Sequence, residues 1–173
     1  MDEMLEMGRQ VVAAQPFSVL IGAELTGFAV GSAELKVPVK KELKQQHGFL
    51  HGGVVSYAAD NALTYVGGSV LGPAVVTSEF KINYVRPAMG DYIVARATAI
   101  YVGKNQAVCR CDVFAVKDAK ESLCATAQGT INKLGQSKWP ESDHSLDIKK
   151  SHPVVLWENA GRLFLRGWSL NQS

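Results

Sequence analysis

One long stretch of the chain is almost free of charge, and it restricts the possible folds more than any other feature. From His51 to Ser78 the only side chain that is charged at neutral pH is Asp60. Apolar residues recur on nearly every side of the helix that this stretch predicts, namely Val54, Val55, Ala58, Ala59, Ala62, Leu63 and Val66. A helix of this kind must be wrapped by other parts of the protein. Its end is predicted by a group of helix-breaking residues, Gly67, Gly68, Gly72 and Pro73.

The same stretch is long enough to raise a membrane-spanning interpretation. Against it stand Asp60 and Asn61 near the middle, the Gly67-Gly68 pair, and the absence of flanking basic clusters. We therefore favour a helix that is buried inside protein, and we expect no contact with a membrane.

The segments around this helix predict strands and one further helix. Residues 2–14 suit a short amphipathic helix that ends before Pro16, and residues 21–39 alternate loosely around Gly31-Ser32, as a hairpin does. After the central helix come four runs of β-type composition, at residues 74–85, 92–102, 106–117 and 121–134. The order is hairpin, central helix and four-strand meander. This order predicts an α+β fold in which one antiparallel sheet wraps around one hydrophobic helix.

We expect a single core and three parts along the chain. These are an N-terminal helix over residues 1–16, the sheet-and-helix domain over residues 17–134, and a C-terminal extension over residues 135–173. The extension begins with a polar, turn-rich segment and becomes apolar again after Pro153, which predicts a tail that docks on the domain or on a second subunit.

Charge and cysteine content narrow the partners and the compartment. The chain has 18 basic and 16 acidic residues, a balance that argues against nucleic acid or an anionic membrane as the main partner. Cys109, Cys111 and Cys124 form no even framework and no metal-type pair, so we interpret them as reduced, buried thiols. The acidic start, Met-Asp-Glu-Met-Leu-Glu, does not look like a secretory signal, and we expect a cytoplasmic location.

Asp60 allows two interpretations. A carboxylate in apolar surroundings is costly unless it is paired or hydrogen-bonded. The structural interpretation is that hydroxyls on the same helical face, those of Ser56 and Thr64 at i−4 and i+4, or a partner subunit satisfy it. The functional interpretation is that the acid faces a ligand, and helical spacing alone leaves both open.

The loop before the helix favours the functional interpretation. Gly52 and Gly53 let the backbone come close to a ligand, and the free N–H groups of a helix's first turn carry the positive end of its dipole. Such a turn can act as an oxyanion hole. By itself His51 is typical of a histidine that ties down a loop, and Gln45 is typical of a solvated amide, although it can donate to a carbonyl oxygen.

These residues resemble a known family. The pattern Gln45-x5-His51-Gly52-Gly53, with an acid nine positions after the histidine, is similar to that of the hot-dog-fold acyl-CoA thioesterases. The resemblance is to the group that contains the phenylacetate-pathway and 4-hydroxybenzoyl-CoA-type enzymes. It spans about residues 17–134 and includes "VTSEFKINYVRPAMGD", which resembles the family's strand after the central helix and its Arg-Pro turn.

The resemblance implies a catalytic role for each residue of the motif. Asp60 would act as general base on water or as nucleophile on the thioester carbonyl. The Gly52 N–H and the Gln45 amide would contact the carbonyl oxygen, and His51 would hold the loop and the substrate end. The hydroxyls that orient the water would come from Thr64 and Thr77. The pairing of Gln45 with an aspartate mixes two subgroups of the family, which leaves base and nucleophile both open for Asp60.

The resemblance also implies partners. The substrate would be an acyl-CoA, and the protein would form a homodimer or homotetramer in which one subunit supplies the acid and the other the oxyanion loop. Gly53 would lie against the substrate, and the candidates for contacting the coenzyme A phosphates are Lys81, Arg86 and Lys104. We predict no cofactor and no metal. Aromatic residues that are candidates for an acyl pocket are Phe17, Phe49, Tyr57, Tyr65, Phe80 and Tyr84.

The same fold also serves two other functions. A dehydratase or hydratase is disfavoured, because the His-Phe-Pro-x-x-Pro pattern and the Asp-x5-His order are missing. A non-catalytic module that binds acyl-CoA remains open, since the sequence alone does not distinguish binding from turnover.

Overall fold

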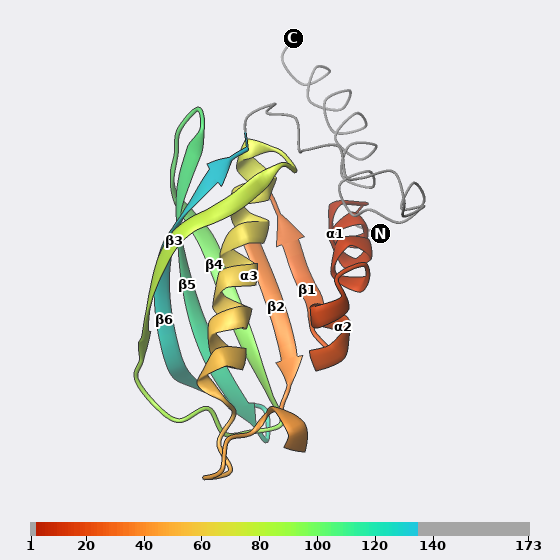
Figure 1. The fold of residues 1–173 in the computed structure, drawn as a ribbon, viewed down its shortest axis with the longest axis vertical. Coiled ribbons are helices and arrows are strands. Elements are labelled where there is room, and N and C mark those ends of the chain that lie inside the picture. The colour runs from red at the N-terminus through yellow and green to blue at the C-terminus, as the bar shows by residue number, and fades with distance from the viewer. Residues whose placement is uncertain (1–2, 135–173) are drawn as a thin grey trace, which may run out of the picture.

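A curved antiparallel sheet wraps around one side of a long helix, α3 (Gly52–Leu71), as Figure 1 shows. The structure is a computed structural model and describes residues 3–134. The predicted C-terminal extension, residues 135–173, lies outside the described residues. The α+β architecture predicted from the sequence is confirmed.

The strand positions agree closely with the predicted ones. The hairpin consists of β1 (Glu24–Ala29) and β2 (Ser32–Pro38), and the four later strands are β3 (Val75–Tyr84), β4 (Tyr92–Val102), β5 (Gln106–Lys117) and β6 (Lys120–Lys133). A short 3₁₀ helix, η1 (Lys41–Leu43), follows the hairpin. Alternating apolar residues and short turns were sufficient to predict these elements.

The order of the strands differs from the predicted meander. The sheet has the order β1-β2-β4-β5-β6-β3, so only β4, β5 and β6 follow one another as a meander. β3 pairs with β6 at one edge, and β4 pairs with β2 in the middle of the sheet. The "RPAMGD" segment, which resembles the family's Arg-Pro turn, carries the chain from the edge strand β3 across to β4. Within residues 3–134 the outer edge of β3 has no pairing strand.

The core lies between α3 and the concave face of the sheet. Ala58, Ala59 and Ala62 are fully buried, and their small side chains let the helix axis approach the strands. The sheet side of this core is formed by branched and small apolar residues, among them Leu35, Val37, Ile93, Ala95, Val113 and Ile131. Burial of this apolar surface is the main force that holds the helix against the sheet.

The opposite face of α3 is not covered by the sheet. The half-exposed residues on this open face are Ser56, Tyr57, Asp60, Asn61 and Thr64. These polar groups interrupt the apolar surface of the helix, and no helix within residues 3–134 is long and apolar enough to cross a membrane.

α3 runs past the predicted glycine stop. It continues through Gly67 and Gly68 to Leu71 and ends at Gly72. Gly67 is inside the helix because the sheet comes very close there: a Cβ at this position would lie 2.3 Å from Ile131 Cγ2 and 2.5 Å from Ile131 Cβ. The glycine therefore marks a close helix–sheet contact and not a helix end.

This contact predicts that Gly67→Ala destabilises the protein, although alanine is the better helix former. The propensity gain is at most about 1 kcal/mol, whereas forcing a methyl group against the fully buried Ile131 costs roughly 1–3 kcal/mol. We expect a lower urea midpoint with an unchanged m-value. As a control, Ser56→Ala on the open face should change the free energy of unfolding by less than about 0.5 kcal/mol. A Gly67→Ala protein as stable as the wild type would contradict this packing.

Two short helices precede the sheet. α1 (Glu3–Ala13) packs against β1 through Val11 and Val12, as expected for an amphipathic helix. The second helix, α2 (Pro16–Ile21), was not predicted from the sequence. The signals for it were present, because proline stands at its start and Gly22 closes it with a left-handed φ of 77°.

Polar side chains fasten α2 to α3. Ser18 Oγ lies 2.6 Å from both Gln15 Oε1 and Tyr57 Oη, and Asn61 Nδ2 donates to Tyr57 Oη over 2.7 Å. Burial raises the pKa of Tyr57, which therefore stays a neutral hydroxyl in this network. The network fixes α2 beside the open face of α3.

Candidate active site

Asp60 lies on the open face of α3 and is held by a threonine from the sheet. Thr77 Oγ1, on β3, donates to Asp60 Oδ1 over 2.8 Å. Thr64, one turn along the helix, donates its hydroxyl to the Asp60 main-chain carbonyl over 2.9 Å, and the two threonine hydroxyls are 2.9 Å apart. The structure thus brings together Asp60, Thr64 and Thr77, for which the resemblance implied a joint role.

An irregularity in β3 explains how Thr77 reaches the acid. The pairing of β3 with β6 shifts register between Thr77 and Glu79. Strict alternation would put Thr77 and Phe80 on opposite faces of the strand, but both are half-buried toward α3. A bulge of this kind redirects side chains near functional sites, and here it brings a hydroxyl to Asp60 without loss of the Phe80 contact to the core.

The structural interpretation of Asp60 named the wrong partners. Ser56 Oγ lies 3.0 Å from Tyr84 Oη instead of bonding the carboxylate, and Thr64 bonds the main chain. Among the residues that the structure describes, the carboxylate accepts one hydrogen bond, from Thr77, and it stays half-exposed on the helix face. An acid with such a limited set of donors keeps oxygen lone pairs available for a ligand or a water.

The start of α3 presents a free backbone donor. His51 is the N-cap, and its Nδ1 accepts from the Gly53 N–H over 3.0 Å, which requires an unprotonated Nδ1. No group within residues 3–134 accepts from the Gly52 N–H, the first donor of the 20-residue helix. A free N–H at this point has the dipole and the direction needed to bind an anionic oxygen.

The loop that carries Gln45 is folded tightly. The Gln45 N–H donates to Phe49 O and the Gly48 N–H donates to Gln45 O, both over 2.9 Å. The loop is tied to its surroundings by the bond from His51 N–H to Leu43 O over 2.8 Å. Gln45 is half-buried, and it belongs to the loop that leads into the start of α3.

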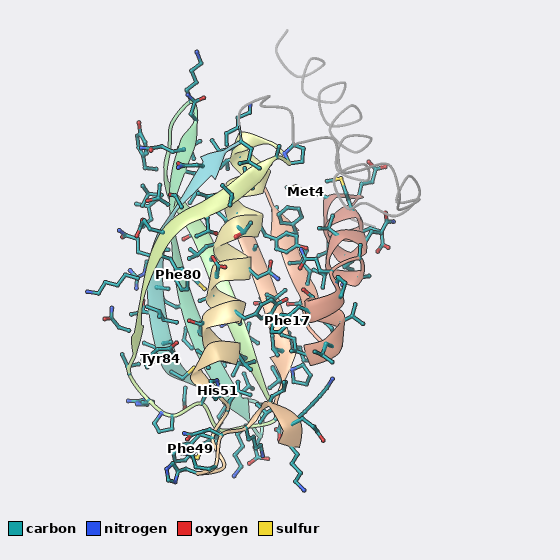
Figure 2. All side chains as sticks on the ribbon, in the orientation of Figure 1. Met4, Phe17, Phe49, His51, Phe80 and Tyr84 are labelled. Atoms are coloured by element: carbon teal, nitrogen blue, oxygen red, sulfur yellow. The ribbon has the colours of Figure 1, made fainter. Side chains whose placement is uncertain are left out.

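Tyr84 is a site residue whose contacts sequence reasoning missed. Its hydroxyl donates to the carbonyl oxygen of Gly52 over 3.1 Å and contacts Ser56 Oγ. Figure 2 shows Tyr84 and His51 at the end of α3 where the helix begins. The sequence identified Tyr84 as an aromatic residue but gave no signal that its hydroxyl reaches the main chain of the glycine turn.

The aromatic candidates for an acyl pocket divide into four groups. Phe80 and Tyr84 lie on the β3 side of α3, and Phe17 lies on the α2 side (Figure 2), where its ring contacts Tyr57 edge-on at 5.2 Å. Phe49 lies in the loop before the helix. Tyr65 is only 4% exposed and packs against Phe28, so it is a core residue and not a pocket residue.

The three candidate cations are not gathered in one place. Lys81 lies in the middle of β3, on the face opposite to Phe80 and Ile82, which point toward α3. Lys104 lies in the turn between β4 and β5, beside the end of β6, where the Lys133 N–H donates to Asn105 O. Arg86 follows β3, where its N–H bonds Cys124 O, and it is the one of the three at the end of the sheet that holds the glycine turn.

Cysteine does not supply the nucleophile. Cys109, Cys111 and Cys124 are buried free thiols, as predicted. Burial raises the pKa of Cys109 and Cys124 to about 11 and that of Cys111 to about 12, so all three remain protonated at neutral pH. Within the part of the chain that the structure describes, no three His, Cys, Asp or Glu side chains gather in a group that could hold a metal ion.

The comparisons with known proteins agree on one family. Residues 47–122 match the model of the thioesterase superfamily. A thioesterase family protein from Silicibacter pomeroyi has a solved structure that is 34% identical, with a TM-score of 0.71 over 75% of this chain and 98% of its own. The structure of a thioesterase from Haemophilus influenzae is 26% identical, with a TM-score of 0.69 over 80% and 97%. A 1,4-dihydroxy-2-naphthoyl-CoA hydrolase from Listeria monocytogenes is 27% identical over 113 residues, 64% of this chain and 89% of that protein.

Proposed function

This chain belongs to the thioesterase superfamily of thioester hydrolases, and from that premise we propose that it cleaves an acyl- or aryl-acyl-CoA to the free acid and coenzyme A. Asp60 provides the catalytic carboxylate and the Gly52 N–H provides the oxyanion donor. The observation that carries this proposal is the half-exposed Asp60 held by Thr77, together with the N–H at the start of the same helix, which has no acceptor within residues 3–134. The name of the Listeria relative supports coenzyme A as the thiol part of the substrate.

Thioester hydrolysis needs only a few groups, and the open face of α3 offers them. Asp60 removes a proton from water as the water attacks the carbonyl carbon, and the C–S bond of the tetrahedral intermediate then breaks to release coenzyme A as a thiolate. Alternatively, Asp60 attacks the carbon itself, the C–S bond breaks to release the thiolate and leave a mixed anhydride, and water then hydrolyses the anhydride. Because a thiolate is a good leaving group, no strong general acid is required. Thr64 and Thr77 orient the water or the carboxylate.

The developing negative charge on the carbonyl oxygen is stabilised at the helix start. The Gly52 N–H points out of the first turn, where the dipole of a 20-residue helix adds positive potential. An oxyanion donor of this kind contributes roughly 3–4 kcal/mol to the stability of the transition state. Gln45 adds a side-chain amide near the same oxygen, and His51 holds the turn and the substrate end.

One chain cannot place both groups on one thioester. Gly52 and Asp60 are eight residues apart on a continuous helix, a separation of about 12 Å along its axis. A thioester carbonyl group is far shorter than this separation. The acid that acts on its carbon and the N–H that contacts its oxygen must therefore come from different helices. We therefore assign Asp60 to one copy of the chain and the glycine turn to a second copy.

The free edge of β3 supports a two-fold arrangement of this kind. β3 is ten residues long, ends the sheet within the described residues, and carries Thr77 beside Asp60. A second copy whose β3 pairs antiparallel to the first would continue the sheet and bring a second α3 alongside, running in the opposite direction. The assembly is then a homodimer, or a homotetramer of two such pairs.

The remaining assignments follow from this placement. Gly53 lies against the substrate beside the turn. Arg86 lies at the same end of the sheet as the glycine turn, where it can contact a coenzyme A phosphate. Lys81 and Lys104 are the other candidate phosphate contacts, from elsewhere along the sheet. An acyl-CoA substrate fits a cytoplasmic enzyme.

The proposal is tested by turnover of a panel of thioesters. Wild-type protein is mixed with acetyl-, hexanoyl-, benzoyl- and phenylacetyl-CoA, and a thiol-detecting dye records the free coenzyme A. We expect at least one ester to be hydrolysed with a kcat/KM above about 10⁴ M⁻¹ s⁻¹. Protein that binds these esters but releases no thiol would instead be a non-catalytic acyl-CoA-binding module.

A further inference from the structure

We propose that Tyr84 is a positioning residue that fixes the glycine turn, so that the Gly52 N–H points at the thioester oxygen. The inference rests on the proposed function and adds a residue to it. It is based on the contacts of the Tyr84 hydroxyl with Gly52 and Ser56.

The peptide unit between Gly52 and Gly53 is held at both of its polar ends. Its carbonyl oxygen accepts from Tyr84 Oη over 3.1 Å, and its N–H donates to His51 Nδ1 over 3.0 Å. Two consecutive glycines have wide freedom in φ and ψ, and the N–H groups of a helix's first turn have no acceptor within the helix. The two side chains therefore add a restraint at Gly52-Gly53.

Fixing this peptide also fixes the donor before it. The Gly52 N–H belongs to the preceding peptide unit, which is joined to the held unit through φ and ψ of Gly52, so a carbonyl held in place restricts the directions that the free N–H can take. An oxyanion donor is effective only when it is aligned before the reaction begins. Loss of the Tyr84 bond would let the Gly52-Gly53 turn change its orientation. The hydrogen bond from the Gly52 N–H to the oxyanion would then be weaker in the transition state.

The hydroxyl, and not the ring, carries this role. Tyr84 is 53% exposed, so its ring contributes little to the core. Its single hydroxyl hydrogen goes to Gly52 O, which leaves Ser56 as the donor to Tyr84 Oη. The result is a relay from Ser56 through Tyr84 to Gly52, in which each donor strengthens the next bond.

Tyr84→Phe removes the relay and keeps the ring. We expect kcat for the best ester of the panel to fall about tenfold while KM changes less than about twofold, because the bond orients a group used in the transition state. Ser56→Ala should lower kcat by a smaller factor. The double variant should be no slower than Tyr84→Phe, since both changes break one relay. The control is Tyr101→Phe on β4, which is 58% exposed and should behave as wild type.

The outcomes separate the inference from the proposed function. An unchanged kcat in Tyr84→Phe overturns the inference and leaves the proposed function standing. Effects of Tyr84→Phe and Ser56→Ala that multiply, with a matching loss of thermal stability, also overturn it, because they indicate two independent structural roles. If Tyr84→Phe fails to fold, an unchanged kcat in Ser56→Ala overturns it and a reduced kcat at constant KM supports it. Wild-type protein that hydrolyses no ester overturns the proposed function and the inference together.

Discussion

Asp60→Asn is expected to slow thiol release by roughly 10²–10⁴-fold, the contribution typical of a positioned general base. The amide has the shape of the carboxylate, and its oxygen can still accept from Thr77 Oγ1. What the variant loses is the negative charge, which is the property needed to take a proton from water or to attack the carbonyl carbon. Coenzyme A release from the best ester of the panel, with kcat and KM separated, provides the measurement.

The fold should survive this change. Asp60 is half-exposed, and a neutral side chain costs less to keep beside apolar residues than a charge does. The chain also offers a matched control in Asp112, a carboxylate on β5 that accepts from Thr126 Oγ1 over 2.6 Å. Asp112→Asn changes the same chemical group and should leave turnover at the wild-type level. A full rate in the folded Asp60→Asn protein would show that the acid has only a structural role.

Gly52→Pro is expected to lower kcat by about 10²–10³-fold, the loss measured when one oxyanion donor is removed. Proline has no N–H, and the first position of a helix is where it is best tolerated. His51 has φ −62° and ψ 135°, an extended conformation that suits a residue before proline. A Cβ at Gly52 would lie 3.7 Å from the Tyr84 ring, an ordinary contact. The substitution therefore removes the donor and keeps the helix.

Gly52→Ala is the matched control for this variant. It adds the same Cβ but retains the N–H, so most of the activity should remain. If Gly52→Pro were as active as Gly52→Ala, the backbone donor would have no part in the reaction. Circular dichroism and the thermal midpoint establish that both variants are folded.

Much of the fold could be predicted because its signals are local. The predicted runs at residues 92–102 and 106–117 coincide with β4 and β5, since alternating apolar residues and the short Gly103 turn define them. The central helix could be predicted from its near absence of charge. α2 carried a proline start and a glycine stop, but its six residues are too few for a periodic pattern.

The position of β3 could not be predicted in the same way. Its composition is that of any strand, and which neighbour it pairs with depends on contacts far away in the sequence. The predicted end of the helix was wrong for a related reason. Gly67 is needed because Ile131, a residue 64 positions later, packs closely against it. Glycine looks the same in a sequence whether it ends a helix or admits a close neighbour.

The candidate site was predictable in part. Asp60 and the glycine turn are conspicuous in the sequence, one as a lone acid and the other as a helix start. Thr77 was found only through the family resemblance, because a bulge in β3 turns it toward the acid. Tyr84 was missed as a polar contact, since the fold alone brings the end of β3 to the start of α3.

The most direct test is to combine two inactive variants in one dimer. Asp60→Asn and Gly52→Pro chains carry different affinity tags, and the mixed dimer is purified through both. If each site takes its acid from one copy and its backbone donor from the other, a two-fold dimer of these chains has one intact site, so about half of the wild-type rate should return. Mixed dimers no more active than the parent variants would contradict a site that is shared between two copies.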